Sequence, residues 1–335
     1  MKCFVTGATG FVGSNLVHEL VTRGHRVRAL VRAGADDRAL LGVKCEQVTG
    51  DILDRTLLER ELAGCNWCFH VAADYRLWRR NYAPMYQANV EGTRNVLAAA
   101  GKACCDRIVF TSTAACIGHA KKVGGKIVPA TESDLATAAD LAGDYVRSKF
   151  LAEGVAMELF RKQALPVVIV NPTMPVGPGD AKPTPTGKLI LDFLARRLPA
   201  YLDTGLNWVH IRDVVAGHIL AAEKGTLGQR YILGNKDGNW TMPQTFAALK
   251  ELTGIAGPQK KIPHWLAVRV AEVGEMIASV TGRPPRVPMA GVKLAAHKMW
   301  FNPARAIREL GLPQTPPPQA FADAITWFRA NGMAK

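Results

Sequence analysis

The chain has 335 residues, 48% of them hydrophobic, so it can bury one large core or two cores of ordinary size. No apolar run approaches the ~18 residues of a membrane helix and no signal peptide opens the chain, which predicts a globular cytoplasmic protein without an integral membrane segment. The net charge of +14 suggests an anionic partner such as a phosphorylated cofactor or substrate, or a peripheral membrane contact. The basic residues are scattered, form no nucleic-acid-binding motif and are more often ordinary solvated surface.

Strand-like apolar runs alternate with helical patterns through the first half of the chain. The predicted strands are Lys2 to Thr6, Arg26 to Val31, Val43 to Val48, Trp67 to Val71, Arg107 to Thr111 and Val167 to Val170. This rhythm is typical of βαβ units and predicts an α/β fold, a doubly wound parallel sheet of the Rossmann kind, over residues 1–172.

The composition of the sequence changes after Asn171. The stretch NPTMPVGPGDAKPTPTG, from Asn171 to Gly187, is rich in proline and glycine and predicts a long loop that leaves the sheet. Residues 173–335 are expected to form a smaller, mostly helical part on the substrate side. A predicted strand at Arg230 to Leu233 indicates that segments near 206–234 return to the first domain.

A glycine-rich stretch, FVTGATGFVG, joins the first strand to the first helix. Its glycines are three apart where the chain must turn, approach a ligand with bare backbone and pack a helix on the sheet. A helix from Phe11 to Arg23 would aim its free N–H groups at a pyrophosphate. The first gap is one residue longer than in the usual fingerprint, but the placement predicts a dinucleotide site formed by Gly7, Thr9, Gly10, Phe11, Val12 and Gly13.

The end of the second strand bears on which dinucleotide binds. An acid there usually holds the ribose 2′-hydroxyl of NAD, whereas Arg32 suits the 2′-phosphate of NADP. We therefore predict NADP. NAD is the alternative, if Arg32 is an ordinary surface residue and Asp36 or Asp37 reaches the ribose.

Tyr145 and Lys149 are four apart in a helical pattern, so both project from one face. A phenol has a reference pKa of about 10, and a nearby ammonium favours the phenolate and lowers that pKa. The lysine could also hold ribose hydroxyls. A third hydroxyl is expected at the end of the fifth strand, where Thr111, Ser112 and Thr113 stand, although strand-end capping is the commoner role of such groups.

Further motifs follow the glycine stretch in order: GDILD, FHVAADY, NVEGTRNVL, VFTSTAACIG, YVRSK, VNPTMPVGPGD and VHIRDVVAGHIL. The set spans most of the chain and resembles the extended short-chain dehydrogenase/reductase family, also known as the NAD-dependent epimerase/dehydratase family. Within it, the chain resembles the dihydroflavonol-reductase-like branch. HVAADYRLW, KPTPTG and PAYLDTGLN look most like the bacterial hopanoid-associated sugar epimerases.

The resemblance implies that Thr113 is the catalytic hydroxyl and that Tyr145 and Lys149 complete the catalytic set. It also implies cofactor contacts, besides those of Tyr145 and Lys149, from Arg32, Asp51, Ile52, Val71, Ala72, Ala73, Asn89, Thr111, Asn171, Pro172 and Met174. On sequence alone, Asp51 could equally be a helix N-cap or a turn acid.

The implied reaction is hydride transfer between nicotinamide and a carbinol or carbonyl carbon, with Tyr145 moving the proton of the oxygen and Thr113 bonding that oxygen. Leu206 stands where relatives that epimerise nucleotide sugars commonly carry an arginine. Aromatic residues expected at the mouth of the site, or else in ordinary packing, are Tyr75, Trp78, Tyr82, Tyr201 and Trp208. We therefore expect an NADP(H)-dependent oxidoreductase of a bulky, apolar small molecule. Sugar epimerisation is the alternative, and a non-catalytic dinucleotide-binding regulator is a third hypothesis.

All seven cysteines precede residue 117, and an odd, clustered set fits a reducing compartment better than a disulfide framework. Cys65 and Cys68 with Cys104 and Cys105 could be read as zinc ligands. The second pair is adjacent and no neighbouring histidine completes the set, so we expect no metal. In the resembling family the helices bearing NVEGTRNVLAAA and Tyr145 commonly form a four-helix interface, which predicts a homodimer.

Overall fold

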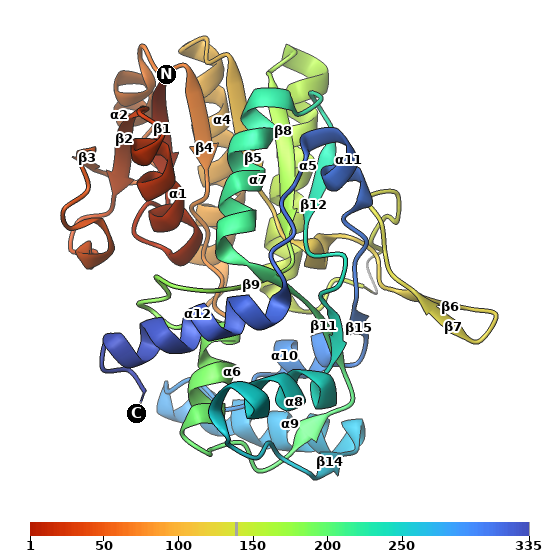
Figure 1. The fold of residues 1–335 in the computed structure, drawn as a ribbon. Helices are drawn as coiled ribbons and strands as arrows, with labels where there is room; N and C mark the ends of the chain where they lie inside the picture. Colours follow the sequence, from red (N-terminus) through yellow and green to blue (C-terminus); the bar gives the residue numbers. More distant parts are fainter. Residues whose placement is uncertain (138–139, 335) are drawn as a thin grey trace.

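The computed structural model describes residues 1–137 and 140–334 and is built around a parallel sheet (Figure 1). Seven strands lie in the order β12-β8-β5-β4-β1-β2-β3, and every neighbouring pair is parallel. Their bounds are β1 Lys2–Thr6, β2 Arg26–Val31, β3 Glu46–Thr49, β4 Trp67–His70, β5 Arg107–Thr111, β8 Val167–Pro172 and β12 Arg230–Leu233. The strand order turns at β1, and the carboxyl ends beside such a turning point are where doubly wound sheets bind ligands.

Helices cover both faces of this sheet, and each face has its own apolar core. The first face is covered by α1 Phe11–Thr22, α7 Ile211–Lys224 and α11 Ala304–Leu310. The second is covered by α2 Arg55–Leu62, α4 Gly92–Lys102 and α5 Gly143–Gln163. Because both faces are buried, the strands read as continuous apolar runs in the sequence. The predicted doubly wound α/β fold is confirmed.

A smaller part lies beyond the carboxyl ends of the strands, at the lower end of the molecule in Figure 1. Its strands are β9 Met174–Val176, β10 Tyr201–Leu202, β11 Gly205–His210, β13 Asn239–Thr241, β14 Lys261–Ile262 and β15 Lys298–Met299. Its helices are α6 Pro185–Leu194, α8 Met242–Thr253, α9 His264–Thr281, α10 Met289–Ala295 and α12 Pro317–Ala330. Strand β11 pairs with β9, β13 and β15 and ties these segments together.

Short elements connect the larger ones. They are the turns Arg38–Leu40, Gln87–Glu91 and Ala114–Cys116, the helix α3 Ala83–Tyr86, and the hairpin of β6 Lys121–Val123 and β7 Lys126–Val128. Figure 1 shows that hairpin projecting from the body of the molecule.

Several sequence predictions about elements were wrong in detail, and two of them have a clear physical reason. The segment from Asn171 to Gly187 is not a continuous loop, because it contains β9 and the first turn of α6, where Thr184 caps the helix and Pro185 fits since its missing N–H needs no partner. The third strand begins at Glu46 rather than Val43, because the Val43 N–H still bonds to Leu40 O in the preceding turn.

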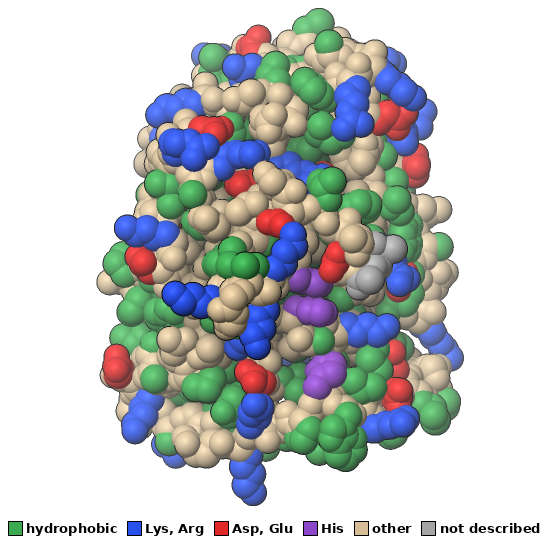
Figure 2. All heavy atoms as spheres, turned by 90° about the vertical axis from the view of Figure 1, so that its right-hand side faces the viewer, with side chains coloured by type: hydrophobic (Ala, Val, Ile, Leu, Met, Phe, Trp, Pro, Cys, Tyr) green, Lys and Arg blue, Asp and Glu red, His purple; other side chains and the backbone are tan. Residues whose placement is uncertain are grey.

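Charge is spread over the surface. Figure 2 shows Lys and Arg side chains distributed over one face with Asp and Glu among them, rather than gathered in one basic patch. Among the residues that the structure describes, no helix has both the length and the apolar character needed to cross a membrane.

Candidate active site

The glycine loop after β1 is packed too closely for larger residues. Gly7 has a φ of +69°, and a Cβ there would lie 2.6 Å from Ala72 N, while a Cβ on Gly13 would lie 2.1 Å from Gly7 O. Helix α1 starts from Gly10, which has no side chain to occupy the first-turn N–H groups. Those donors and the positive end of the helix dipole suit a pyrophosphate.

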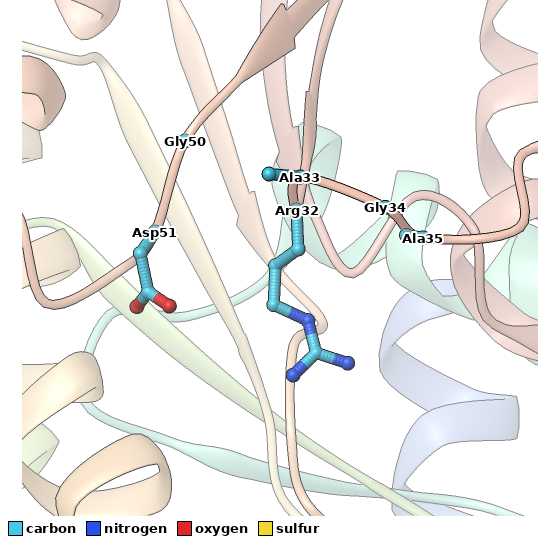
Figure 3. Close-up of a pocket in the computed structure, with 6 residues that line it drawn as sticks. All are labelled: Arg32, Ala33, Gly34, Ala35, Gly50 and Asp51. Carbon is cyan, nitrogen blue, oxygen red and sulfur yellow. The ribbon is translucent and has the colours of Figure 1, made fainter.

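A cavity of about 410 Å³ opens at the carboxyl ends of β2 and β3. It is lined by Arg32, Ala33, Gly34, Ala35, Gly50 and Asp51. Figure 3 shows the side chains of Arg32 and Asp51 extending into the same open space from neighbouring segments. Within residues 1–137 and 140–334, the Arg32 guanidinium has no ion-pair partner. A free guanidinium in a cavity is suited to a phosphate.

Two of the nearby acids, Asp36 and Asp51, make hydrogen bonds within the chain, whereas Asp37 is exposed and stays open as a ribose contact. Asp36 accepts two hydrogen bonds from the Arg38 guanidinium, at 2.9 Å from Nε and 2.8 Å from Nη2, so its carboxylate is occupied by that arginine. Asp51 Oδ1 accepts the N–H of Leu53 at 2.9 Å, so Asp51 does act as a turn acid, whereas Asp54 is the N-cap of α2. One oxygen of Asp51 is left to contact a ligand.

Thr113, Tyr145 and Lys149 come together where β5 and α5 meet. Tyr145 and Lys149 lie one turn apart on α5, and the Thr113 side chain hydrogen-bonds that of Tyr145. Thr113 also accepts the N–H of Ala115 at 3.3 Å, so it caps the turn after the strand as well. The structure thus brings Thr113 and Tyr145 into contact and places Lys149 one turn further along the same helix.

Burial controls the proton chemistry of these groups. Burial raises the pKa of Tyr145, and the hydrogen bond from Thr113 offsets only part of that rise. The sequence predicts that Lys149 lowers the pKa of Tyr145. In this structure the lysine instead donates from Nζ to Thr111 O at 2.7 Å, and burial outweighs any such effect. Burial also lowers the pKa of Lys149 to about 8, so its ammonium persists at neutral pH.

The three hydroxyls at the end of β5 have different roles. Thr111 Oγ1 lies 3.0 Å from His218 Nε2, and Ser112 Oγ donates to Glu153 Oε2 at 2.5 Å. Only Thr113 turns toward Tyr145. Thr111, predicted to contact the cofactor, uses its hydroxyl on α7 and its carbonyl on Lys149, so it positions the lysine.

Asn89 also acts as a brace. Its Oδ1 accepts the N–H of Asp74 at 2.7 Å, and its Nδ2 donates to Asp74 O at 2.9 Å and to Ser148 Oγ at 2.8 Å. The side chain is fully buried and its amide is fully used. Asn89 therefore fixes the segment that follows β4 against the catalytic helix.

A buried histidine, which the sequence did not reveal as part of the site, continues this brace. His70 Nδ1 lies 2.8 Å from Thr6 Oγ1 and its Nε2 lies 2.9 Å from Thr93 Oγ1. Since the Thr93 hydroxyl donates to Asn89 O at 2.6 Å, it must accept from Nε2, which places the proton of His70 on Nε2. Burial lowers the pKa of His70 to about 3, so the ring is neutral.

Glu153 is a second buried group that sequence reasoning missed. It lies one turn beyond Lys149 on α5, accepts Asn171 Nδ2 at 3.2 Å through Oε2 and forms an ion pair with Arg230 of β12. The signal was present, because Tyr145, Lys149 and Glu153 recur every four residues. Asn171 keeps a buried Oδ1 with no partner in the described chain, which leaves an acceptor for a ligand donor.

The other predicted cofactor residues lie at or just after the ends of strands. Val71, Ala72 and Ala73 are half-buried after β4, and Ile52 is buried after β3. Asn171 and Pro172 end β8, and Met174 lies half-buried in β9.

The five predicted aromatic residues divide into two groups. Tyr75, Trp78 and Tyr82 lie on the segment after β4, and the phenol of Tyr75 is near enough to affect the pKa of Tyr145. Tyr201 packs on a phenylalanine of α8, and Trp208 is fully buried with Nε1 donating to a threonine of α8. The last two therefore belong to the core of the smaller part, and Trp208 has no surface with which to line an entrance.

Among the described residues no group of three or more His, Cys, Asp or Glu could hold a metal ion. All seven cysteines are free thiols.

Comparisons with known proteins agree with this geometry. The sequence model of the NAD dependent epimerase/dehydratase family matches residues 3–234. A protein of Synechocystis sp. named "Putative dihydroflavonol 4-reductase" is 45% identical over 99% of this chain and 96% of its own length. "Sterol demethylase protein B" of Methylococcus capsulatus is 35% identical over 99% of this chain and 100% of its own. The solved structure of a nucleoside-diphosphate-sugar epimerase from Pseudomonas aeruginosa superposes with a TM-score of 0.80 at 25% identity, covering 100% of this chain and 99% of that one.

Proposed function

The chain belongs to the NAD dependent epimerase/dehydratase family, and from this premise we propose that it is an NADP(H)-dependent oxidoreductase of a bulky, largely apolar ketone or secondary alcohol. It is an NAD(P)-dependent reductase or epimerase, as its relatives are. The observation that carries the proposal is the meeting of Thr113, Tyr145 and Lys149 at the end of β5, in a sheet whose first strand ends in the glycine loop. Fold alone would not support an activity, but this constellation does.

The proposed chemistry divides between the cofactor and the chain. A bound nicotinamide supplies or accepts the hydride. Tyr145 gives a proton to the substrate oxygen in reduction, or removes it in oxidation, while Thr113 hydrogen-bonds the same oxygen. Because burial raises the pKa of Tyr145, its resting form is the phenol, which suits proton donation. The Lys149 ammonium favours the phenolate once that proton has left.

Three features support the fit of a dinucleotide. The first-turn N–H groups of α1 can bind a pyrophosphate, and the unpartnered Asn171 Oδ1 can accept a hydrogen bond from the ligand. The free guanidinium of Arg32 favours NADP over NAD, since Asp36 is held by Arg38.

The apolar substrate is inferred from the residues that border the site. Tyr75, Trp78 and Tyr82 offer apolar and aromatic surface, and Leu206 supplies no charge for a nucleotide diphosphate. Two of the most similar relatives are named for a flavonoid reductase and for sterol processing, both with bulky ring systems as substrates in their names. We also propose a reducing, cytoplasmic setting, which suits the seven free thiols.

The test is turnover by purified protein with NADPH or NADH and a panel of polycyclic ketones, aliphatic ketones and nucleotide sugars. We expect loss of NADPH absorbance with apolar ketones. Tyr145→Phe keeps the ring but removes the proton, so turnover should fall by ~10² to 10⁴ while NADPH affinity stays nearly unchanged. Lys149→Met should reduce both. Wild-type turnover in Tyr145→Phe on a confirmed substrate would contradict the proposal.

Sugar epimerisation remains the second candidate, favoured by the family name and by the solved epimerase. The two reactions share Thr113, Tyr145 and Lys149 and differ in whether the keto product leaves or is reduced again on its other face. Inverted sugar product with no net consumption of NADPH would favour the epimerase. A protein that binds NADPH and acts on neither class would instead be the non-catalytic regulator.

A further inference from the structure

Helix α9 presents an apolar face to solvent. Its inner side is a stripe of small residues, Ala267, Ala271 and Ala278, which packs against the body of the smaller part. Its outer side carries seven large apolar residues that are 38% to 79% exposed: Trp265, Leu266, Val270, Val273, Met276, Ile277 and Val280. Single exposed apolar residues are ordinary, but seven on one helix mark an interaction surface.

These residues form a continuous stripe. Leu266, Val270, Val273, Ile277 and Val280 recur at alternating intervals of four and three, which places them on one side of the helix over its whole length. Figure 1 shows α9 at the end of the molecule away from the amino terminus. Nothing in the described chain covers it.

Basic residues flank this stripe. Arg283 and Arg286 follow the helix, and Arg80 approaches its end, since a Cβ on Gly282 would lie 3.9 Å from Arg80 Nη1. Lys260 precedes the helix. In the described part of the chain none of these four has an acidic partner. On the helix itself, Arg269 and Glu272 form an ion pair that is neutral overall, and Glu275 accepts the N–H of Met289 at 2.8 Å.

This arrangement identifies one kind of occupant. A second copy of the chain docked on this face would bring cationic ends against cationic ends in either orientation. An anionic lipid surface satisfies both features at once, because apolar side chains enter the boundary of the acyl region while arginines meet lipid phosphates. Trp265, 66% exposed at one end, is of a type suited to that boundary. We propose that α9 docks the protein on anionic membrane surfaces.

The segment that carries Tyr75, Trp78 and Tyr82 approaches the end of α9 through Arg80, as Gly282 shows. It also contacts α10, because a Cβ on Gly291 would lie 3.7 Å from Leu77 Cδ1. An apolar substrate could therefore pass from the lipid to the site. This consequence rests on the proposed function, whereas the docking does not.

The first test is flotation of the purified full chain with vesicles of phosphatidylcholine, with and without phosphatidylglycerol. The wild type should bind only the anionic vesicles, and less so as salt rises. Val273→Glu with Ile277→Glu should weaken binding at least about tenfold, because two charges enter the apolar boundary. Leu41→Glu with Val123→Glu makes the same charge change at residues that are 70% and 60% exposed elsewhere, and should have no effect.

A second pair isolates the charges. Arg283→Gln with Arg286→Gln should weaken binding about tenfold, whereas Lys122→Gln with Lys126→Gln on the β6–β7 hairpin should not. Bound vesicles should shift tryptophan emission to the blue in the wild type but not in Trp265→Phe. Circular dichroism checks folding, and the arginine and tryptophan variants decide the matter if the glutamate variant does not fold.

Three results would overturn the proposal. The first is that the wild type fails to bind anionic vesicles. The second is that both members of each matched pair of variants weaken binding equally, which would indicate non-specific attraction. The third is that the α9 variants change the oligomeric state instead, which would indicate that a second copy of the chain covers α9. Each readout is independent of turnover, so a failure here leaves the proposed function standing, and the reverse also holds.

Discussion

Single hydrogen bonds decide which of three similar side chains acts at the end of β5. Thr111 is committed to His218, and Ser112 is committed to Glu153, so neither hydroxyl can serve a substrate without breaking a buried bond. Thr113 keeps its hydroxyl at Tyr145. Neighbouring residues with the same chemistry are thus separated by the partners that the fold gives them.

This difference predicts the outcome of substitutions at position 113. Thr113→Ser should be mild, because only the hydroxyl is needed. Thr113→Val keeps the shape and removes the hydroxyl, so kcat should fall by about 10² as one donor to the reacting oxygen is lost. Steady-state kinetics on a confirmed substrate measures both. Ser112→Ala is the control and should lose stability more than kcat; near-normal kcat in Thr113→Val would refute the assignment.

The free guanidinium of Arg32 predicts cofactor choice. Arg32→Asp should weaken NADPH binding by about 10- to 100-fold, the size of a lost hydrogen bond to a charged group, and leave NADH binding equal or tighter. Titration of tryptophan quenching with each cofactor measures the ratio. Arg26→Asp makes the same charge change at the other end of β2 and should leave the ratio unaltered. Equal wild-type affinities for the two cofactors, unaffected by Arg32→Asp, would show that Arg32 is an ordinary surface residue.

At the scale of elements, the site depends on buried polar chains that join segments far apart in sequence. Thr6 of β1, His70 of β4 and Asn89 before α4 form one such chain, and it holds the segment after β4 in place. Glu153 joins α5 to β12 in the same way through Arg230. Each link satisfies polar groups that would be costly to bury alone.

The neutral state of the buried histidines predicts acid sensitivity. The pKa values of His70 and His218 are lowered by burial to about 3 and about 4, so between pH 6.5 and those values only the unfolded chain binds the extra protons. Stability is therefore complete above pH 6.5 and is lost as pH falls. Each histidine should lower the free energy of unfolding by about 2 kcal/mol when the pH falls from 7 to 5.

Denaturant unfolding at both pH values measures this loss. Over the same pH interval, the free energy of unfolding of His70→Gln should fall by about 2 kcal/mol less than that of the wild type. Asp180, whose pKa burial raises to about 6, acts in the opposite direction, so the difference between variant and wild type isolates the histidine. An identical loss in both proteins would mean that His70 is not kept neutral by folding.

Much of the fold could be predicted from local sequence patterns, whereas elements that depend on long-range pairing could not. β1, β5 and β12 have the predicted bounds, because a strand buried on both faces is a plain apolar run between turn residues. Strand β9 was missed because it is defined by pairing with β11 rather than by its own Met-Pro-Val sequence. The catalytic pair was visible from helical spacing, but the burial of Trp208 depends on Phe321, in the last helix, and no local pattern shows it.

At the scale of the whole molecule, two surfaces remain available for partners. The apolar face of α9 lies on the smaller part, while α4 and α5 pack together on one face of the parallel sheet. The outer side of α5 carries Leu151, 50% exposed, and Gly154, where a Cβ would meet nothing within 4 Å. Small and apolar residues on an outer helix face allow close approach of another helix.

We predict that the protein is a homodimer that joins through α4 and α5. Leu151→Glu with Gly154→Glu should convert it to a monomer, because the interface would have to bury unpaired like charges. Light scattering at micromolar concentration measures the mass of each protein. Leu41→Glu, at an exposed residue outside α4 and α5, should leave the dimer intact. A monomeric wild type under these conditions would rule out the dimer. A dimer that survives both charges on α5 would have its interface elsewhere. The α9 glutamate variants would then show whether the apolar face of α9 is that interface.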